Sequence, residues 1–219
     1  MIINNLVRLV CIILFSSTMI SNLTAVISTR KGTINDWLKI IELETKIYTT
    51  LINEAQTKNR ERLYMENFML SEFTIIAAHA FSPWLKKMKK NIFEEKHVDL
   101  MVCYEEDQRK DENFIGYCTF SVKGEHAYFD SCAYHEKTID DLNFSQALQQ
   151  YLLENYNCVK FMFAADLFPE TQDPICMYHK NRYLRLGFVQ TDHPHALSYA
   201  PDEQIKSSAQ GYVLNLLTT

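Results

Sequence analysis

The sequence predicts an α/β (α+β) domain with a mixed sheet, in which an antiparallel meander of strands is followed by a strand–helix–strand–helix–strand segment. Three observations predict this fold class. Apolar residues recur at helical spacing as far as Phe81, and from His97 onward the period is that of strands. Two later strands are separated by one helix, which favours parallel pairing. The run YLRLGF, from Tyr183 to Phe188, is typical of a helix that ends at a glycine.

Composition limits the classes of function. The chain has 219 residues, which suits one domain with an appended segment, and its 47% apolar and 22% charged residues indicate an ordinary core. The net charge of −5 argues against a nucleic-acid binder, because phosphate backbones require a basic surface. Five glycines and five prolines leave little room for flexible linkers. We therefore expect one domain over residues 33–219.

Residues 1–25 differ in kind from the rest of the chain. A positive charge at Arg8 precedes the mostly apolar run Leu9–Ile20, and small or polar residues follow as far as Ala25. This layout is that of a secretory signal peptide, and the run is short for a membrane span of about 20 residues. The segment predicts an exported protein, secreted or periplasmic. The alternatives are an uncleaved N-terminal anchor, which would be the protein's membrane contact, and a plain apolar helix.

Two helices are expected before the sheet. Thr33–Glu54 carries apolar residues at mostly three- and four-residue spacing, and Ser71–Phe81 repeats that pattern with Ser71 as its N-cap. Pro83 interrupts the second pattern, and we interpret the basic run that follows as a solvated helix face. The basic run consists of Lys86, Lys87, Lys89 and Lys90.

Three strands then form the meander. They are expected around Leu100–Tyr104, over Phe114–Val122 and over His126–His135. A charged turn, Glu105–Glu112, joins the first pair, and Lys123-Gly124-Glu125 joins the second. Strands connected by turns this short pair in the antiparallel sense.

Helices are interleaved with strands in the last part of the chain. A helix that begins near Asn143 precedes the apolar strand Val159–Leu167. A second helix, Ile175–Leu186, ends with Gly187 in the C′ position. The two final strands are expected at Phe188–Thr191 and Gly211–Leu216.

This order of elements, together with YLRLGF, resembles the GNAT N-acetyltransferase superfamily over roughly Ser71 to Leu216. The hexapeptide matches the family's tyrosine–x–basic–leucine–glycine–phenylalanine helix ending. The resemblance implies that the strands His126–His135 and Val159–Leu167 splay apart and admit acetyl-CoA as a cosubstrate, without a metal. It implies transfer of an acetyl group to an amine, carried by a small molecule or by a protein.

The resemblance also implies which groups bind the cosubstrate. The pantetheine arm would pair with open strand backbone, and the pyrophosphate would lie at the next helix N-terminus, where free N–H groups and the helix dipole favour anions. The strand residues are Ala133, Tyr134 and His135, and the helix residues are Asn143, Phe144 and Ser145.

Catalytic roles follow from the same resemblance. Tyr183 would protonate the leaving thiolate, and Glu105 or His135 would supply the base that deprotonates the amine. Each residue also has a plain structural interpretation: Tyr183 as a core aromatic, Glu105 as part of a solvated turn, and His135 as a surface histidine.

The phosphate loop departs from the family pattern. The family reads Arg/Gln-x-x-Gly-x-Gly/Ala, whereas the corresponding segment Asp140–Ser145 has neither the glycines nor the cation. Asp140 and Asp141 stand where a pyrophosphate would approach and would repel it. Cys176 replaces the family's asparagine. Since acetyl-CoA is also scarce outside cells, an alternative function is a catalytically inactive GNAT-fold binding or interaction module of an exported protein.

Histidine and cysteine patterns add two weaker hypotheses. His193 and His195 form an H-x-H pair, but the proline between them favours a turn and no third ligand has matching spacing, so no metal site is predicted. Five cysteines follow Cys11, all in apolar stretches and without a CxxC pair. We interpret them as buried hydrophobic residues, with a disulfide between Cys118 and Cys132 as the alternative.

Overall fold

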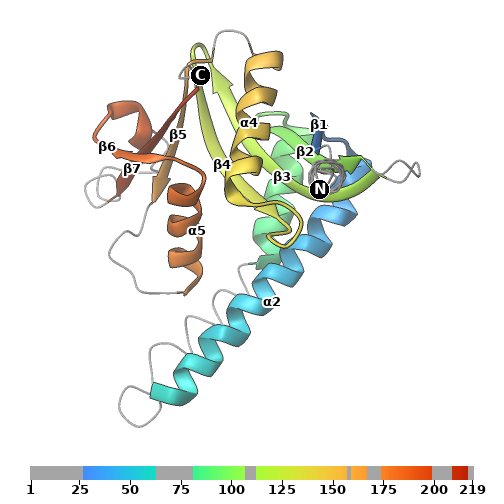
Figure 1. Cartoon of the computed structure of the whole chain (residues 1–219), viewed down its shortest axis with the longest axis vertical. Helices are drawn as coiled ribbons and strands as arrows, with labels where there is room; N and C mark the ends of the chain where they lie inside the picture. Colours follow the sequence, from blue (N-terminus) through green and yellow to red (C-terminus); the bar gives the residue numbers. More distant parts are fainter. Residues whose placement is uncertain are drawn as a thin grey trace, which may run out of the picture.

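The computed structural model describes residues 27–62, 81–106, 112–156, 159–166, 174–198 and 209–216. Within these ranges a seven-stranded sheet has the order β1-β2-β3-β4-β5-β7-β6 (Figure 1). The strands are β1 (Ile27–Lys31), β2 (Asp99–Glu106), β3 (Glu112–Lys123), β4 (His126–Tyr134), β5 (Phe161–Asp166), β6 (Val189–Thr191) and β7 (Gln210–Asn215). The mixed sheet expected from the sequence is thereby confirmed.

The predicted meander is present, and one strand was not foreseen. β2, β3 and β4 pair in the antiparallel sense, and Gly124 turns the second hairpin with a φ of 60°. β1 pairs antiparallel with β2 from Ile27↔Glu105 to Lys31↔Met101. Its sequence ISTRK has a single apolar residue and therefore gave no strand signal. Pairing with the edge of β2, a tertiary contact, makes it a strand.

β4 and β5 are parallel but stay together only briefly. Their pairing runs from His126↔Phe161 to Tyr128↔Phe163 and then stops, while β5 continues to pair with β7 as far as Asp166. A bulge lies at the same point, because Thr119 and Phe120 of β3 face Ser131 and Phe129 of β4, which leaves Asp130 as an extra residue. Bulges bend a strand. The two strands therefore diverge, as Figure 1 shows, and we call the space between them the strand gap.

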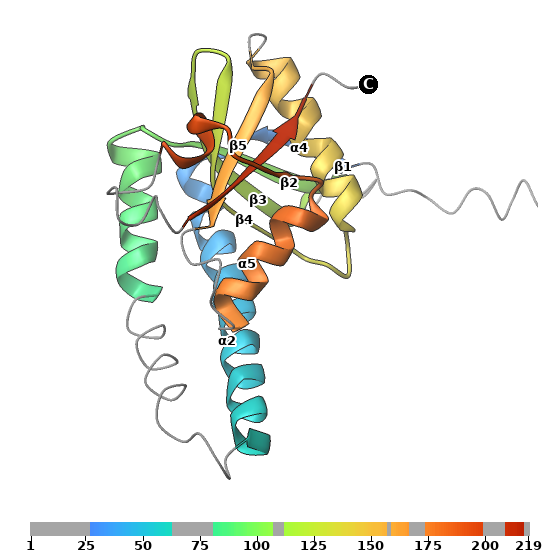
Figure 2. The same ribbon diagram turned by 90° about the vertical axis from the view of Figure 1, so that its left-hand side faces the viewer.

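Helices cover both faces of the sheet (Figure 2). On one face lie α2 (Trp37–Arg62), the helical residues 81–89 and the short π-helical turn η2 (Lys90–Glu94), packed around Ile40, Leu100 and Tyr117. On the other lies α4 (Asp141–Asn155), whose Phe144 and Leu148 pack in the main core. Successive residues of β2 are buried alternately in the core beneath α2 and in the main core beneath α4, which is the two-residue period expected of a strand.

α2 starts where the sequence predicted a helix. Thr33 and Asp36 form a capping box at the 3-10 turn η1 (Ile34–Asp36), which leads directly into α2. The predicted helix Ser71–Phe81 lies outside the described residues except for Phe81, and so do residues 1–25 with their expected leader. The basic side chains from Lys86 to Lys90 are exposed, as predicted for a solvated face.

α5 (Pro174–Arg185) ends as the motif YLRLGF indicates. Gly187 adopts a φ of 88°, and the N–H of Phe188 donates to the carbonyl oxygen of Tyr183 at 3.0 Å. This is the left-handed C′ ending that glycine permits. Leu186 and Phe188 are consequently buried in the main core. No helix among the described residues is both long and apolar enough to cross a membrane.

Candidate functional site

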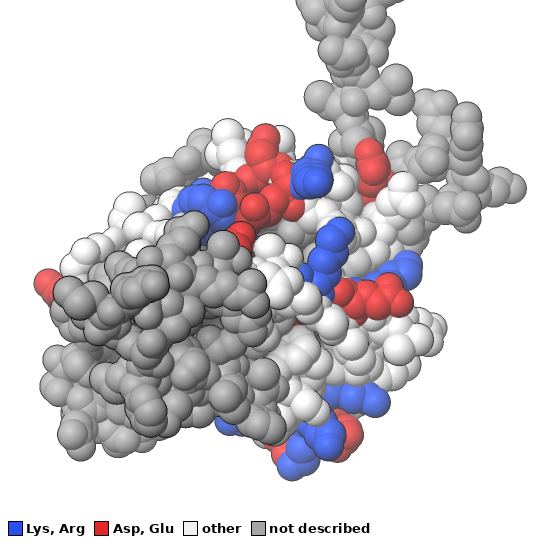
Figure 3. Space-filling view, turned by 90° about the horizontal axis from the view of Figure 1, so that it is seen from below, with Lys and Arg blue, Asp and Glu red and all other residues white. Residues whose placement is uncertain are grey.

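A cavity of about 570 Å³ lies between α2, the segment that follows β4, and α5. We call it the α2–α5 cavity. α2 contributes Lys46 and the apolar Leu43, the segment after β4 contributes His135 and Lys137, and α5 contributes Arg185. The cavity is located at the carboxyl end of β4, where β4 no longer pairs with β5. Seen from this end of the molecule, basic and acidic side chains are interspersed (Figure 3).

His135 lies in this cavity. Its backbone N–H donates to the carbonyl oxygen of Ile115 at 2.8 Å, which extends the β3–β4 ladder by one residue. Burial lowers the pKa of His135 below its ordinary value, and the ammonium group of Lys46 lowers it further. The imidazole is therefore neutral near pH 7 and able to accept a proton.

Tyr134 forms the inner wall of the cavity. Its hydroxyl donates to the carboxylate of Asp141, and its ring stacks on Phe144 with centroids 4.3 Å apart. Burial and this hydrogen bond raise the pKa of Tyr134. Tyr134 is thus fixed in place by two residues of the first turn of α4.

The N-terminus of α4 is occupied by the protein's own carboxylates. Asp140 is the N-cap, and its Oδ1 accepts from the backbone N–H of Asn143 at 2.8 Å. Asp141 lies in the first turn, with its Oδ2 3.6 Å from Nε of Arg185. The hydroxyl of Ser145 donates to the carbonyl oxygen of Leu186 at 2.6 Å and so links α4 to the end of α5. A phosphate at this helix end would meet two like charges.

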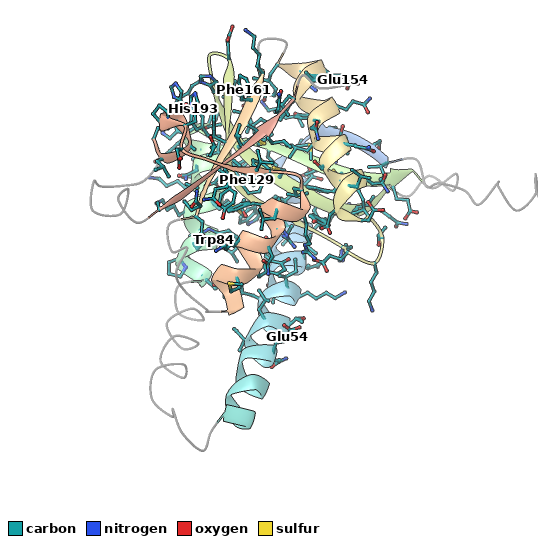
Figure 4. All side chains as sticks on the ribbon, turned by 60° about the vertical axis from the view of Figure 1, so that its left-hand side comes forward. Glu54, Trp84, Phe129, Glu154, Phe161 and His193 are labelled. Carbon is teal, nitrogen blue, oxygen red and sulfur yellow. The ribbon has the colours of Figure 1, made fainter. Side chains whose placement is uncertain are left out.

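Tyr183 lies at the strand gap, between Phe129 of β4 and Tyr212 of β7. Its ring meets Phe129 of β4 edge-on at 5.4 Å and lies 5.6 Å from the ring of Tyr212 in β7. Figure 4 shows Phe129 in the interior, close to α5. Burial raises the pKa of Tyr183, and Cys132 and Asp166 on the two diverging strands raise it further. The phenol is therefore protonated and faces both strands, but it is not among the residues that line the α2–α5 cavity.

The other predicted site residues are distributed around the gap. Ala133 is buried on the α2 face and pairs with Tyr117 of β3. Glu105 lies near the end of β2, opposite Ile27 and Asn113, and is not among the residues that line the cavity. Of the two candidate bases, the structure thus brings His135 to the cavity and leaves Glu105 at the far edge of the meander.

Two buried charged residues were not singled out from the sequence. Glu44 of α2 is 6% exposed and accepts a hydrogen bond from the hydroxyl of Tyr117. Burial raises its pKa, although the Tyr117 hydrogen bond and Arg182 act in the opposite direction. Arg182 of α5 is 2% exposed, and its Nη1 donates to the carbonyl oxygen of Cys132 at 2.5 Å. Helical spacing from Ile40 already places Glu44 on the apolar face, and that signal could have revealed it.

The histidine pair has a third neighbour that the sequence did not reveal. The rings of His193 and His195 lie 5.2 Å apart at the turn η3 (Pro194–Leu197), and His126 of β4 lies 4.4 Å from His195. Figure 4 places His193 near Phe161, at the end of the sheet away from the cavity. Among the described residues, no group of three or more side chains has metal-binding geometry.

Three of the cysteines are buried free thiols. Cys118 and Cys132 face each other across β3 and β4, and Cys103 lies nearby on β2. Burial raises the pKa of Cys103 to about 12 and that of Cys132 to about 11, so neither ionises near neutral pH. This confirms, for these three, the interpretation as buried hydrophobic residues. The side chains of Cys158 and Cys176 lie outside the description.

Comparison with known proteins yields likenesses of structure only, since no protein-family model and no curated protein matches the sequence. A GNAT-family acetyltransferase from Staphylococcus aureus is 10% identical, with a TM-score of 0.45 over 87% of this chain and 99% of that one. A Campylobacter jejuni N-acetyltransferase in complex with acetyl coenzyme A is 11% identical, with a TM-score of 0.42 over 87% and 99%. An aminoglycoside N(6')-acetyltransferase from Legionella pneumophila is 10% identical, with a TM-score of 0.47 over 87% and 92%.

Proposed function

We propose that the protein is an N-acyltransferase that moves an acetyl group from acetyl-CoA to an amine acceptor. The observation that carries the proposal is the strand gap. β4 continues from Phe129 to Tyr134 after its pairing with β5 has ended, so one edge of its backbone has no partner strand over that stretch in the described part of the chain. Such an edge can pair with the amides of an extended ligand, as an added strand would.

The side chains around the gap supply the required chemistry. The amine attacks the carbonyl carbon of the thioester, and the carbon–sulfur bond breaks to release a thiolate. The protonated phenol of Tyr183, which faces both strands, gives its proton to that thiolate. The neutral imidazole of His135 accepts the proton of the amine. The acceptor enters through the α2–α5 cavity, which His135 lines.

The phosphates of the cosubstrate fit one part of the site and not another. Asp140 and Asp141 occupy the N-terminus of α4, the usual anion position in this fold. Lys46, Lys137 and Arg185 line the cavity instead. We therefore assign the phosphates to these three cations.

A second candidate function is a GNAT-fold binding module without acyl transfer. It is favoured by Arg182, which binds the carbonyl oxygen of Cys132 in the strand gap and so occupies an acceptor that a pantetheine arm would use. It is also favoured by the separation of Tyr183 from the cavity.

Calorimetric titration of the purified protein with acetyl-CoA and with CoA distinguishes the two functions. The transferase should give saturable heat with both ligands and an upward shift of its melting temperature. If neither heat nor a thermal shift occurs at millimolar ligand, the transferase proposal fails and the binding module remains.

A further inference from the structure

The guanidinium group of Arg182 is buried and only partly bonded. Arg182 is 2% exposed, and its Nη1 donates to the carbonyl oxygen of Cys132 at 2.5 Å. Its Nε and Nη2 are also buried, and neither has a hydrogen-bond partner among the described residues. A buried donor without a partner destabilises the folded state, and more so when it is charged. The described residues therefore leave two nitrogens of one buried guanidinium available to a further partner.

The two unbonded nitrogens form one edge of the guanidinium. Nε and the outer Nη point their N–H bonds in the same direction, and this fork matches the two oxygens of a carboxylate or phosphate. Nη1, on the other side, is already used by Cys132. The open edge of Arg182 therefore has the geometry of a bidentate anion receptor.

Neither nearby carboxylate of the protein closes this edge. Oε1 of Glu136 is 3.7 Å from Nη2, which is beyond hydrogen-bonding distance, and it lies 2.9 Å from Nη2 of Arg185 instead. The charge of Arg182 lowers the pKa of Glu44, but the carboxylate of Glu44 accepts its hydrogen bond from the hydroxyl of Tyr117. Arg182 is thus attracted to both acids and bonded to neither.

The α2–α5 cavity gives a ligand access to this edge. The guanidinium carbon lies 4.7 Å from the ring centre of Tyr134 and 4.2 Å from that of Tyr178, and both tyrosines line the cavity. Glu136, which also lines the cavity, is 49% exposed in its side chain and can turn outward with Arg185. An anion that displaces Glu136 reaches Nη2 and Nε directly from the cavity.

We propose that the Nε/Nη2 edge of Arg182 is a binding site for an oxyanion, a carboxylate or a phosphate, carried by a ligand that occupies the α2–α5 cavity. The site stands without acyl transfer. Only the identity of its ligand rests on the proposed function: a carboxylate would belong to the amine acceptor, and a phosphate would belong to the acyl-CoA.

The site is tested by titrating the full-length protein with sodium succinate and, separately, with sodium phosphate, each against sodium chloride at equal ionic strength. Proton–nitrogen NMR of the arginine Nε–H groups reports the site, and the Arg182 signal is assigned through its proximity to the rings of Tyr134 and Tyr178. We expect a saturable shift of that signal with at least one of the two anions and none with chloride. Succinate alone indicates a carboxylate ligand, and phosphate alone indicates a phosphate ligand.

Two variants distinguish binding by the Nε/Nη2 edge of Arg182 from attraction by positive charge alone. Arg182→Lys keeps the charge but loses the fork, and we expect the affinity for the anion to fall about tenfold or more. Arg30→Lys is the matched control, because the fork of Arg30 is already closed by both carboxylate oxygens of Asp36, at 3.0 and 2.9 Å. This variant should bind as the unaltered protein does.

The proposal is overturned if neither anion moves the Arg182 signal, which would mean that water satisfies a purely structural arginine. It is also overturned if Arg182→Lys binds as tightly as the unaltered protein. If that variant does not fold, the titration of the unaltered protein decides alone. Binding of acetyl-CoA without any response at Arg182 would exclude a phosphate ligand and leave the proposed function standing, and the site itself would then be refuted if succinate also gave no response.

Discussion

The hydrogen bond from Nη1 of Arg182 to the carbonyl oxygen of Cys132 joins α5 to the unpaired edge of β4. It places a buried cation at the point where β4 has lost β5 as a neighbour. Arg182 directly precedes Tyr183, the candidate general acid. One turn of α5 therefore carries both the group proposed to protonate a leaving thiolate and a group that competes for the same strand edge.

This relationship predicts that Arg182 contributes little to stability. Arg182→Met keeps most of the side-chain volume and removes a buried cation, two of whose nitrogens have no hydrogen-bond partner among the described residues. Replacing such a charge by an apolar group is often neutral or stabilising. We expect the free energy of unfolding of this variant, measured by urea unfolding in the absence of added anions, to be at least that of the unaltered protein.

Arg30→Met is the contrasting variant for that measurement. Arg30 holds the buried carboxylate of Asp36, whose pKa is lowered to about 2 by hydrogen bonds from Arg30 and Tyr104 that outweigh the effect of burial. Removing Arg30 should lower the free energy of unfolding by about 1–3 kcal/mol. A loss of similar size in Arg182→Met would show that Arg182 is a structural residue and would weaken its assignment to a ligand.

Tyr183→Phe tests the general acid. The change removes one hydroxyl and keeps the ring contacts with Phe129 and Tyr212. We expect turnover of acetyl-CoA with an amine to fall by about a hundredfold or more, while the affinity for CoA and the melting temperature stay the same. Tyr212→Phe is the matched control and should keep its rate. Equal rates for Tyr183→Phe and the unaltered protein would remove the role of Tyr183.

Glu44 predicts a pH dependence of stability. Burial raises its pKa in the folded state above the ordinary 4.5, so the folded protein holds this proton more tightly than the unfolded chain does. The stabilising contribution is complete below pH 4.5 and is lost as the pH rises through the raised value. Glu44→Gln keeps an oxygen for the hydroxyl of Tyr117 and cannot ionise.

We therefore expect Glu44→Gln to lose less stability than the unaltered protein between pH 4.5 and neutrality, as measured by urea unfolding at several pH values. Glu154→Gln, an exposed change on α4, provides the control. Identical pH profiles for Glu44→Gln and the unaltered protein would show that ionisation of Glu44 does not lower the free energy of unfolding.

The sequence predicted those features that depend on neighbouring residues. Gly187 ends α5 because the local chain requires a positive φ, and Gly124 turns a hairpin for the same reason. The strand gap was expected only through the family resemblance. The buried positions of Arg182 and Glu44 depend on how strands and helices separated by many residues meet, and no local pattern encodes the bonding of a guanidinium edge. β1 was missed for the same reason, since its partner β2 lies about 70 residues later in the chain.

The three clustered histidines predict a second pH dependence. Burial lowers the pKa of His126 below its ordinary 6.5, His195 and His193 lower it further, and Glu125 opposes them. As the pH falls, His126 is therefore protonated in the unfolded chain before it is protonated in the folded protein. The contribution of His126 is complete above pH 6.5 and is lost as the pH falls through the lowered value.

His126→Asn should accordingly flatten the fall in melting temperature between pH 6.5 and pH 5. His97→Asn, at an exposed histidine that contacts only Glu95 among the ion pairs described, should leave that fall unchanged. If both variants follow the unaltered protein, the histidine cluster has no part in acid destabilisation.

Asp140 and Asp141 are adjacent in sequence, and their carboxylates have different predicted effects. Asp140 caps α4 through the N–H of Asn143, so Asp140→Ala should lower the free energy of unfolding by about 1 kcal/mol.

Asp141 accepts from Tyr134 and lies beside Arg185, which we assign to the phosphates. Asp141→Asn keeps an acceptor for Tyr134 and removes the charge. It should therefore strengthen the binding of CoA severalfold with little change in stability, because less repulsion opposes the phosphates. Calorimetry at two salt concentrations measures this, since an electrostatic gain must shrink as salt rises. A gain that is independent of salt, or weaker binding, would place the phosphates away from Asp141 and from its neighbour Arg185.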